Sequence, residues 1–409
     1  MNNVKQLDPL SFDMLSPLHT VSSLRFTRGE GASYYTENGK EYVDLNEIRL
    51  VLGQNNRAFN QAMVEALSDI TTMRGDNRAK AELLGYLNRT THGHFAAAHL
   101  TSSGTESAEN AVRLARKLTG RTEILTFWNS IHGRGILSGS MSGVPRRKAH
   151  HGPLAPGLIH LPYPNCAHCP IRKEYGSCGM GCLDLVKDIY NYSSAQDAAA
   201  IIVELCQAAG VVLPPPGYMI ALQKWAKDHG ILFIVDEVQS GMGRSGEMYL
   251  YQKEGLEPDI LLLGKALGNG QHISAMLVRK MPEKDDLYIY AGGSGDDPVA
   301  CRAACEVFRQ LEDGLLDHIR TVGQVLQHGL KELACSPLIK TSRGVSLSGA
   351  IEFYDAEVCA KVGAAVTARG FLPGYGGTTL FLKPPYVVTE RQILRFLQTM
   401  KEILDEMER

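Results

Sequence analysis

Short apolar runs alternate with segments of helical periodicity between about residues 95 and 265, and this alternation limits the possible folds most strongly. The strand-like runs cover residues 124–127, 200–203, 231–235 and 260–263. The helix-like segments cover residues 106–118, 195–198 and 219–229. Because parallel strands need a crossover between them, usually a helix, the pattern predicts an α/β fold with a largely parallel sheet flanked by helices. We expect residues 274–279 to add an antiparallel strand.

The two ends of the chain carry a different pattern. Residues 32–45 are typical of a β-hairpin, with Asn38-Gly39 as the turn, and two long amphipathic helices and a mixed β/α tail follow residue 298. A chain of 409 residues is also long for one small core. We therefore predict a small domain formed by residues 1–60 and 298–409, and a large domain formed by residues 61–297.

Two strand-like runs end in residues that carry chemistry. The run 231–235 is followed by Asp236, and the run 260–263 leads to Lys265, which lies between apolar neighbours. Burial would lower the pKa of Lys265 and make its amine a usable nucleophile. Taken singly, a lysine near a strand end is usually a surface residue, and Asp236 followed by Glu237 would also suit a metal. Together, a buried acid and an amine nucleophile are the protein side of pyridoxal phosphate chemistry.

A candidate anion site precedes the helix-like segment 106–118. Ser103, Gly104 and Thr105 are small or hydroxyl residues at its start. Free backbone N–H groups and the positive end of a helix dipole bind phosphate well, and glycine allows close approach. The alternative interpretation is an ordinary N-capped helix with a glutamate a few residues on.

Composition excludes several classes of protein. The net charge of −2 provides no basic field for nucleic acid or anionic lipid, and 44% hydrophobic with 21% charged residues is typical of a globular enzyme. No apolar run approaches the length that spans a bilayer, and the first residues lack the apolar region of a signal peptide. We expect a cytoplasmic protein with reduced thiols.

Four of the nine cysteines are clustered, at Cys166, Cys169, Cys178 and Cys182. They would suit zinc or an iron–sulfur cluster, with His168 as a further ligand. The alternative is a Pro/Gly-rich surface excursion with reduced thiols, because the spacing permits a tetrahedral site but does not require one.

Four motifs in order give the sequence a family resemblance: Ser-Gly-Thr-Glu at 103–106, His-Gly-Arg at 132–134, Asp-Glu-Val-Gln-Ser-Gly-Met-Gly-Arg at 236–244 and Gly-Lys-Ala-Leu-Gly at 264–268. From about residue 30 onward the chain resembles the class III aminotransferases, which include the 4-aminobutyrate enzymes. The cysteine-containing stretch also resembles an insert of 4-aminobutyrate aminotransferase-like members, which favours an inherited insert over a metal site. The resemblance implies fold type I with a seven-stranded sheet, pyridoxal phosphate as cofactor and a homodimer with the active site at its interface.

The resemblance also implies roles for single residues. Lys265 would form the aldimine with the cofactor and Asp236 would pair with its ring nitrogen. The other cofactor-binding positions would be Ser103, Gly104, Thr105, Ile131, His132, Glu204, Gln239 and Ser294. Arg134 and Glu204 would contact the substrate, with Arg134 binding a carboxylate.

The departures from the family pattern concern the substrate. Ile131 stands where an aromatic residue usually stacks on the cofactor, and Phe381 replaces the arginine that binds the α-carboxylate of glutamate. Lys383 faces the same side two residues later and could supply a cation, although we slightly favour a surface lysine. Ser294 would take over the phosphate contact of a missing threonine. Arg49 is expected near the substrate entrance, where a solvated arginine is the plainer alternative.

The sequence therefore predicts a pyridoxal phosphate-dependent aminotransferase that moves an amino group between an amine or amino acid and an oxo acid or aldehyde. Racemase, epimerase or aminomutase chemistry on the same scaffold is an alternative, because such a reaction needs no clamp for glutamate. A cofactor-binding protein without turnover is a second alternative, which the intact Lys265, Asp236 and Gln239 disfavour.

Overall fold

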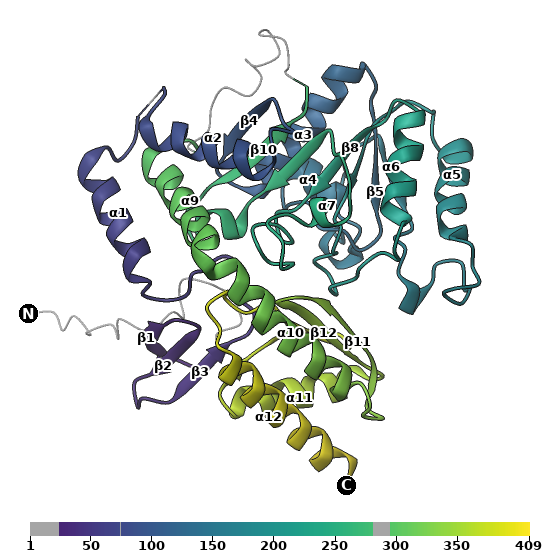
Figure 1. Ribbon diagram of the computed structural model, residues 1–409. Coiled ribbons are helices and arrows are strands. Elements are labelled where there is room, and N and C mark those ends of the chain that lie inside the picture. The colour runs from purple at the N-terminus through teal and green to yellow at the C-terminus, as the bar shows by residue number, and fades with distance from the viewer. Residues whose placement is uncertain (1–23, 74, 281–294) are drawn as a thin grey trace, which may run out of the picture.

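The central element is a seven-stranded sheet with strand order β4-β10-β9-β8-β7-β5-β6 (Figure 1). The computed structural model describes residues 24–73, 75–280 and 295–409. Strand β10 pairs antiparallel with both β4 and β9, and the remaining neighbours are parallel. In spatial order the strands are Ala97–Thr101, Ser274–Val278, Ile260–Leu263, Leu232–Asp236, Ala198–Val203, Glu123–Phe127 and Leu158–Leu161. The predicted parallel sheet and its antiparallel strand are confirmed.

Both faces of this sheet are covered by helices, which explains why its strands are apolar throughout. Along β7, Ile202 belongs to a buried cluster with α3 (Gly104–Thr119), whereas Ile201 and Val203 belong to the cluster on the other face that contains residues of α6 (Tyr218–Asp228). Successive side chains of a strand point to opposite faces, so the alternation buries both. Two further helices lie in this half, α4 (Ile136–Met141) and α5 (Gly181–Ser193). The helix predicted at 195–198 is wrong, because α5 ends at Ser193 and a bend precedes β7.

The two ends of the chain meet in a second region, shown below the large sheet in Figure 1. The predicted hairpin is confirmed as β2 (Ser33–Thr36) and β3 (Glu41–Asp44), and β1 (Phe26–Glu30) pairs with β2. Strand β13 (Phe371–Leu372) adds to β3 in parallel, which joins the N-terminal hairpin to the C-terminal part. The boundaries at residues 60 and 297 stay a prediction.

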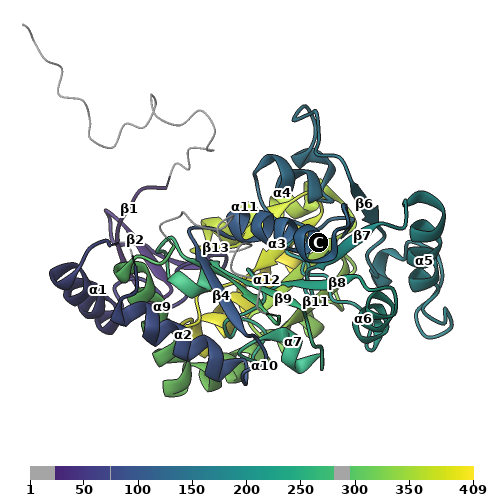
Figure 2. The ribbon, with the colours of Figure 1, turned by 90° about the horizontal axis from the view of Figure 1, so that it is seen from above.

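A second small sheet has the order β11-β12-β15-β14, and all its pairs are antiparallel. Its strands are Ile339–Val345, Ser348–Phe353, Thr379–Leu382 and Gly374–Gly376. The helices of this half are α10 (Leu316–Leu333), α11 (Ala356–Ala368) and α12 (Glu390–Glu408). Figure 2 shows the same arrangement from above, with β11 and α12 behind the large sheet.

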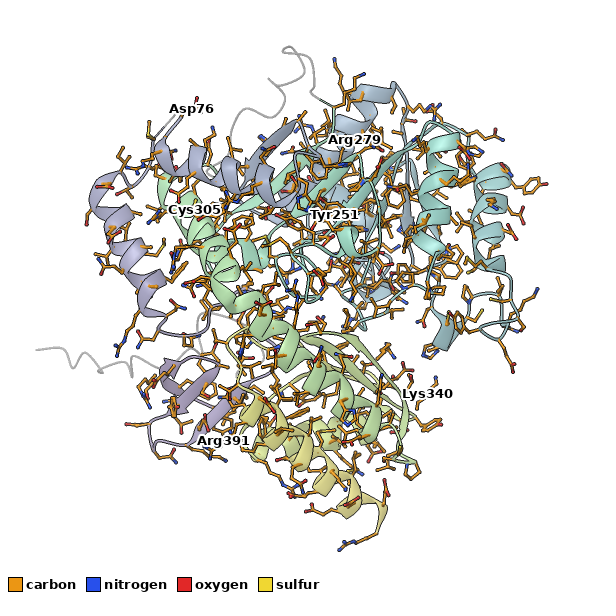
Figure 3. All side chains as sticks on the ribbon, in the orientation of Figure 1. Asp76, Tyr251, Arg279, Cys305, Lys340 and Arg391 are labelled. Carbon is orange, nitrogen blue, oxygen red and sulfur yellow. The ribbon has the colours of Figure 1, made fainter. Side chains whose placement is uncertain are left out.

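Helix α9 (Pro298–Gln310) connects the two regions. It packs against α1 (Arg57–Asp69) and α2 (Arg78–Thr90), and it is followed by α10 after a kink at Gly314, where φ is 92°. In Figure 3, Cys305 marks α9 in the upper half, and Lys340 marks β11 in the lower half. Within the described ranges, no helix is both long and apolar enough to cross a membrane.

Candidate active site

A pocket of about 390 Å³ lies at the edge of the large sheet where β8 and β9 end. Asp236 is the last residue of β8, and Lys265 follows β9 after one glycine. The carboxyl ends of parallel strands meet at one edge of a sheet, which explains why residues far apart in sequence converge here. Lys265 and Asp236 both line the pocket, as the sequence predicts.

Lys265 begins a short 3-10 turn, Lys265–Gly268, and its φ of 46° lies in the left-handed region. Non-glycine residues adopt this conformation rarely, and residues held in such conformations cluster at active sites. Burial lowers the pKa of the Lys265 amine, and Arg147 and Arg134 lower it further, against the opposing charges of Asp236 and Glu204. A larger fraction of the amine is therefore neutral and nucleophilic than for a solvated lysine.

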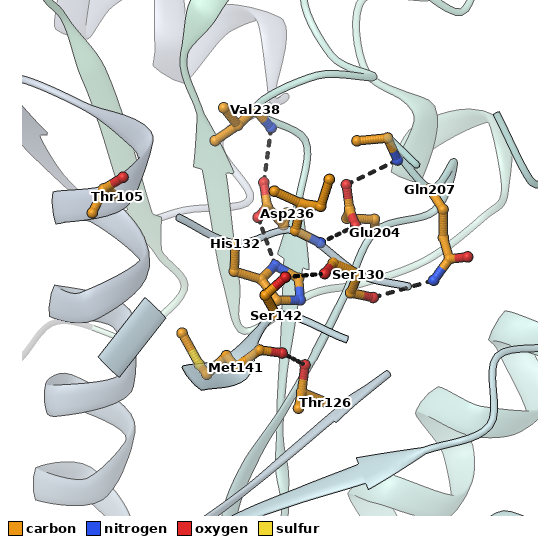
Figure 4. Close-up of polar contacts among 12 residues, drawn as sticks. Thr105, Thr126, Ser130, His132, Met141, Ser142, Glu204, Gln207, Asp236 and Val238 are labelled. Carbon is orange, nitrogen blue, oxygen red and sulfur yellow. Dashed lines mark hydrogen bonds and ion pairs between the residues drawn. The ribbon is translucent and has the colours of Figure 1, made fainter. Parts of the chain in front are cut away.

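Asp236 is held in place by two hydrogen bonds (Figure 4). Its Oδ2 accepts from Nδ1 of His132 at 2.8 Å, and its Oδ1 accepts from the backbone N–H of Val238 at 3.0 Å. Burial by itself would lower the pKa of His132, but the hydrogen bond to Asp236 and the charge of that carboxylate raise the pKa overall. His132 thus fixes the orientation of the Asp236 carboxylate. Nothing in the sequence pattern had predicted this pairing.

Glu204 is buried immediately after β7 and joins two segments of the pocket wall (Figure 4). Its carboxylate accepts from the backbone N–H of Ile131 at 2.8 Å and from that of Ala208 at 3.1 Å. Burial raises the pKa of Glu204 to about 7, although the neighbouring His132 opposes the shift. The sequence predicted that Glu204 belongs to the site, and the geometry gives it a positioning role through Ile131 and Ala208.

The predicted anion site lies at the N-terminus of α3, in the same pocket. Ser103 is the N-cap residue, and its side chain accepts from the backbone N–H of Glu106. The space at Gly104 is too small for a side chain, because a Cβ there would lie 2.9 Å from Cγ1 of Val238. Thr105 lines the pocket and its hydroxyl accepts from the backbone N–H of Arg134 at 3.3 Å.

The remaining lining residues include both predicted and unpredicted positions. Four residues that the sequence predicts to contact cofactor or substrate line the pocket: Arg49, Ile131, Arg134 and Gln239. Arg147 also lines it and was not predicted. The basic stretch 146–148, which follows the motif at 132–134 after one short helix, is the sequence signal that could have identified it.

The structure corrects one expectation, which concerns the environment of Lys383. The interpretation of Lys383 as a surface lysine is wrong, because its side chain is buried and its amine donates to the carbonyl of Ala208 at 2.9 Å. Its Nζ also lies 5.5 Å from the centre of the Phe381 ring. Neither of these two residues is among those that line the described pocket. Ser294 lies outside the described residues, so its predicted phosphate contact stays a prediction.

The sequence comparisons agree with this geometry. A family model described as aminotransferase class-III matches residues 16–404. The chain belongs to the class-III aminotransferase family. It is 30% identical over 395 residues to acetylornithine aminotransferase of Mycolicibacterium smegmatis, which covers 93% of this chain and 94% of that protein. It is also 30% identical over 378 residues to 2-aminoadipate transaminase of Pseudomonas putida, covering 86% and 88%.

Solved structures of aminotransferases share the fold of this chain. An (S)-enantioselective omega-transaminase from Thermomicrobium roseum is 25% identical, with a TM-score of 0.86 and coverage of 96% of both chains. A thermostable omega transaminase 4-fold mutant from Pseudomonas jessenii has a TM-score of 0.90 at 23% identity, with 97% and 98% covered. The protein is thus a pyridoxal phosphate-dependent class-III aminotransferase of fold type I.

The residues of this aminotransferase fit the cofactor. Pyridoxal phosphate carries an anionic phosphate, an aldehyde and a ring nitrogen. The N-terminus of α3 suits the phosphate, the Lys265 amine suits the aldehyde, and the fixed carboxylate of Asp236 suits the ring nitrogen. Ile131 and Val238 add apolar surface to the pocket.

The cysteine-containing insert of the aminotransferase lies away from this pocket. Across the described ranges, no group of three or more His, Cys, Asp or Glu side chains is arranged to hold a metal ion. All nine cysteines are free, and burial raises the pKa of the Cys182 thiol to about 11. His168 is engaged otherwise, because its Nε2 lies 2.6 Å from Oε1 of Glu352 on β12. The insert is therefore tied to the small sheet by a hydrogen bond.

Proposed function

We propose that Lys265, Asp236 and the N-terminus of α3 form the catalytic centre of this aminotransferase. The observation that carries the proposal is their convergence on one pocket from three separate elements. The amine, the acid and the anion cradle match the aldehyde, the ring nitrogen and the phosphate of the cofactor in chemical type. Gln239 lines the same pocket and is proposed to donate a hydrogen bond to the ring oxygen.

The residues of this chain then have distinct tasks. Pyridoxal phosphate, when bound, supplies an electron-withdrawing ring that favours loss of a proton from the carbon bearing the substrate amine. Lys265 would accept that proton on Nζ and hold it for return, because its lowered pKa makes the neutral amine accessible. Asp236 would pair with the ring nitrogen, and His132 holds the Asp236 carboxylate in its orientation.

Arg134 is proposed to bind a carboxylate of the substrate. Its side chain is exposed to the pocket, and a guanidinium group can bind a carboxylate through two parallel hydrogen bonds. The names of the relatives, acetylornithine aminotransferase and 2-aminoadipate transaminase, describe amines that carry carboxylates. Arg49 is proposed to border the entrance, paired with Glu47 at 3.2 Å. Lys383 is proposed to act indirectly, through the carbonyl of Ala208.

We also infer a cytoplasmic homodimer with the active site at its interface. Helix α1 and its C-cap expose three large apolar side chains, Val64, Leu67 and Ile70, at 59%, 55% and 47% of their surface. Val64 and Leu67 are three residues apart and share one face of the helix, so a second subunit could cover both. The nine free thiols fit a reducing compartment.

The proposed centre is tested by the absorbance spectrum of the purified enzyme during addition of single amines and amino acids, glutamate included. We expect a band near the visible edge that Lys265→Ala removes, and its conversion to the amine form of the cofactor by at least one donor. A band that shifts with donors but never converts would favour racemase or epimerase chemistry. An unchanged band in the Lys265→Ala variant would show that the cofactor does not bond to this lysine.

A further inference from the structure

The charges on the pocket wall are not balanced. The cationic side chains other than histidine that line it are Arg49, Arg134, Arg147 and Lys265. Asp236 is the carboxylate of the described lining, and both its oxygens already accept hydrogen bonds. Arg49 has a carboxylate partner in Glu47. The other two lining arginines, Arg134 and Arg147, have no such partner among the described residues. Over the part of the chain that the structure describes, no carboxylate lies within ion-pair distance of either guanidinium group.

Arg147 is positioned by local structure. It is the last residue of the 3-10 turn Pro145–Arg147, which follows α4 closely, and its side chain is half-buried. Burial lowers its pKa first, and the charges of Arg134 and Arg146 lower it further. The two lining guanidinium groups are therefore near enough to repel one another. An anion bound between the two like charges would replace this repulsion by attraction.

The cofactor phosphate already has its own site. Backbone N–H groups and the hydroxyls of Ser103 and Thr105 surround the N-terminus of α3, so the phosphate does not require either guanidinium group. Arg134 is tied to this cradle through its backbone N–H, which donates to the Thr105 hydroxyl, and its side chain stays available.

The other candidate cation for substrate recognition is already engaged. Lys383 directs its amine to the carbonyl of Ala208, and neither Lys383 nor Phe381 belongs to the described pocket lining. The positive charges available to bind a substrate anion are therefore concentrated at Arg134 and Arg147.

We propose that Arg147 is a specificity-determining residue that, with Arg134, forms a subsite for a doubly negative group at the far end of the amine substrate. The inference rests on the proposed reaction at Lys265, which fixes the other end of the substrate. A phosphonate or phosphate and a pair of carboxylates share the required chemistry, since each offers two charges and several acceptor oxygens to two guanidinium forks. A single carboxylate would neutralise one of the two groups and leave the other unpaired.

The test compares four amines of similar length: 3-aminopropylphosphonate, (3-aminopropyl)malonate, 4-aminobutyrate and butylamine. For each donor we measure the second-order rate constant for conversion of the enzyme-bound cofactor to its amine form. This half-reaction needs no second substrate. For the wild type we expect at least one dianionic donor to exceed 4-aminobutyrate by about tenfold, and 4-aminobutyrate to exceed butylamine. Whether phosphonate or malonate ranks first identifies the form of the dianion.

The decisive variant is Arg147→Met, with Arg146→Met as the matched control, because Arg146 is the exposed neighbour and does not line the pocket. We expect Arg147→Met to abolish the advantage of the dianionic donors and to keep the preference for 4-aminobutyrate over butylamine. Arg146→Met should leave the full order unchanged.

Three results would overturn the inference. The first is a wild type that converts dianionic and monoanionic donors equally well. The second is an Arg147→Met variant that slows all four donors by the same factor. The third is weaker binding of pyridoxal phosphate by Arg147→Met with donor selectivity unchanged, which would assign Arg147 to the cofactor. A wild type that converts no amine at all would instead refute the proposed reaction at Lys265.

Discussion

Lys383 is a buried cation, and its charge destabilises the folded protein at neutral pH. Burial is the main cause that lowers its pKa to about 8, whereas a lysine in an unfolded chain titrates near 10.4. Between these values the unfolded state binds more protons than the folded state, so the contribution of Lys383 to stability increases as the pH rises. Relative to Lys383→Met, the wild type should gain on the order of 2 kcal/mol in free energy of unfolding between pH 7.5 and 10.

Urea unfolding of both proteins with cofactor bound, at the two pH values, measures this difference. The same substitution at the exposed Lys401 is the matched control for replacing a lysine by methionine. A constant difference for Lys383→Met would contradict the assignment of a buried, destabilising ammonium group.

Site residues that belong to a motif could be predicted from the sequence. Residues whose position depends on tertiary contacts could not. Asp236 and Lys265 could be predicted because each follows an apolar strand that ends at the same sheet edge. Lys383 could not be placed, because its burial depends on the carbonyl of Ala208, which is distant in sequence. Arg147 was missed because one arginine in a basic stretch is usually solvated, and only the fold brings it to the pocket.

Helix α3 is the element proposed to bind the cofactor phosphate, and we expect Gly104 to be its most sensitive position. Gly104→Ala should weaken binding of pyridoxal phosphate about tenfold or more, because the added Cβ would lie 2.9 Å from Cγ1 of Val238 and displace a side chain of the pocket wall. A fluorescence titration of the cofactor-free protein with pyridoxal phosphate measures the dissociation constant.

Gly85→Ala is the matched control, because Gly85 lies within α2 and a Cβ there meets no heavy atom within 4 Å. Its cofactor affinity should equal that of the wild type, and the helix should gain about 0.5–1 kcal/mol. Unchanged affinity in Gly104→Ala would place the phosphate elsewhere.

At the scale of elements, the strands and most helices of the large sheet could be predicted because hydrophobic periodicity is a local signal. The helix predicted at 195–198 failed for lack of length, since four residues cannot establish a helical period. The two-residue strand β13 carries no local pattern, and it forms because β3 offers a free edge nearby.

For the whole molecule, we predict a homodimer that covers the apolar face of α1. Leu67→Asp should dissociate it, because the substitution buries a carboxylate against the apolar face of the second subunit. Sedimentation velocity of the two proteins at the same concentration measures the change. Leu394→Asp on α12, where the leucine is 49% exposed, should leave the dimer intact. A monomeric wild type, or a dimer that tolerates Leu67→Asp, would contradict this interface.

We expect the cofactor to bond to Lys265 and to no other lysine. Borohydride reduction of the purified enzyme makes this bond permanent, so that protease digestion and mass spectrometry can locate it. The cofactor adduct should lie on the peptide containing Lys265. Lys383 is the informative competitor, since its side chain is buried and burial lowers its pKa, as it does for Lys265. An adduct on Lys383, or on any lysine other than Lys265, would contradict the proposed active site.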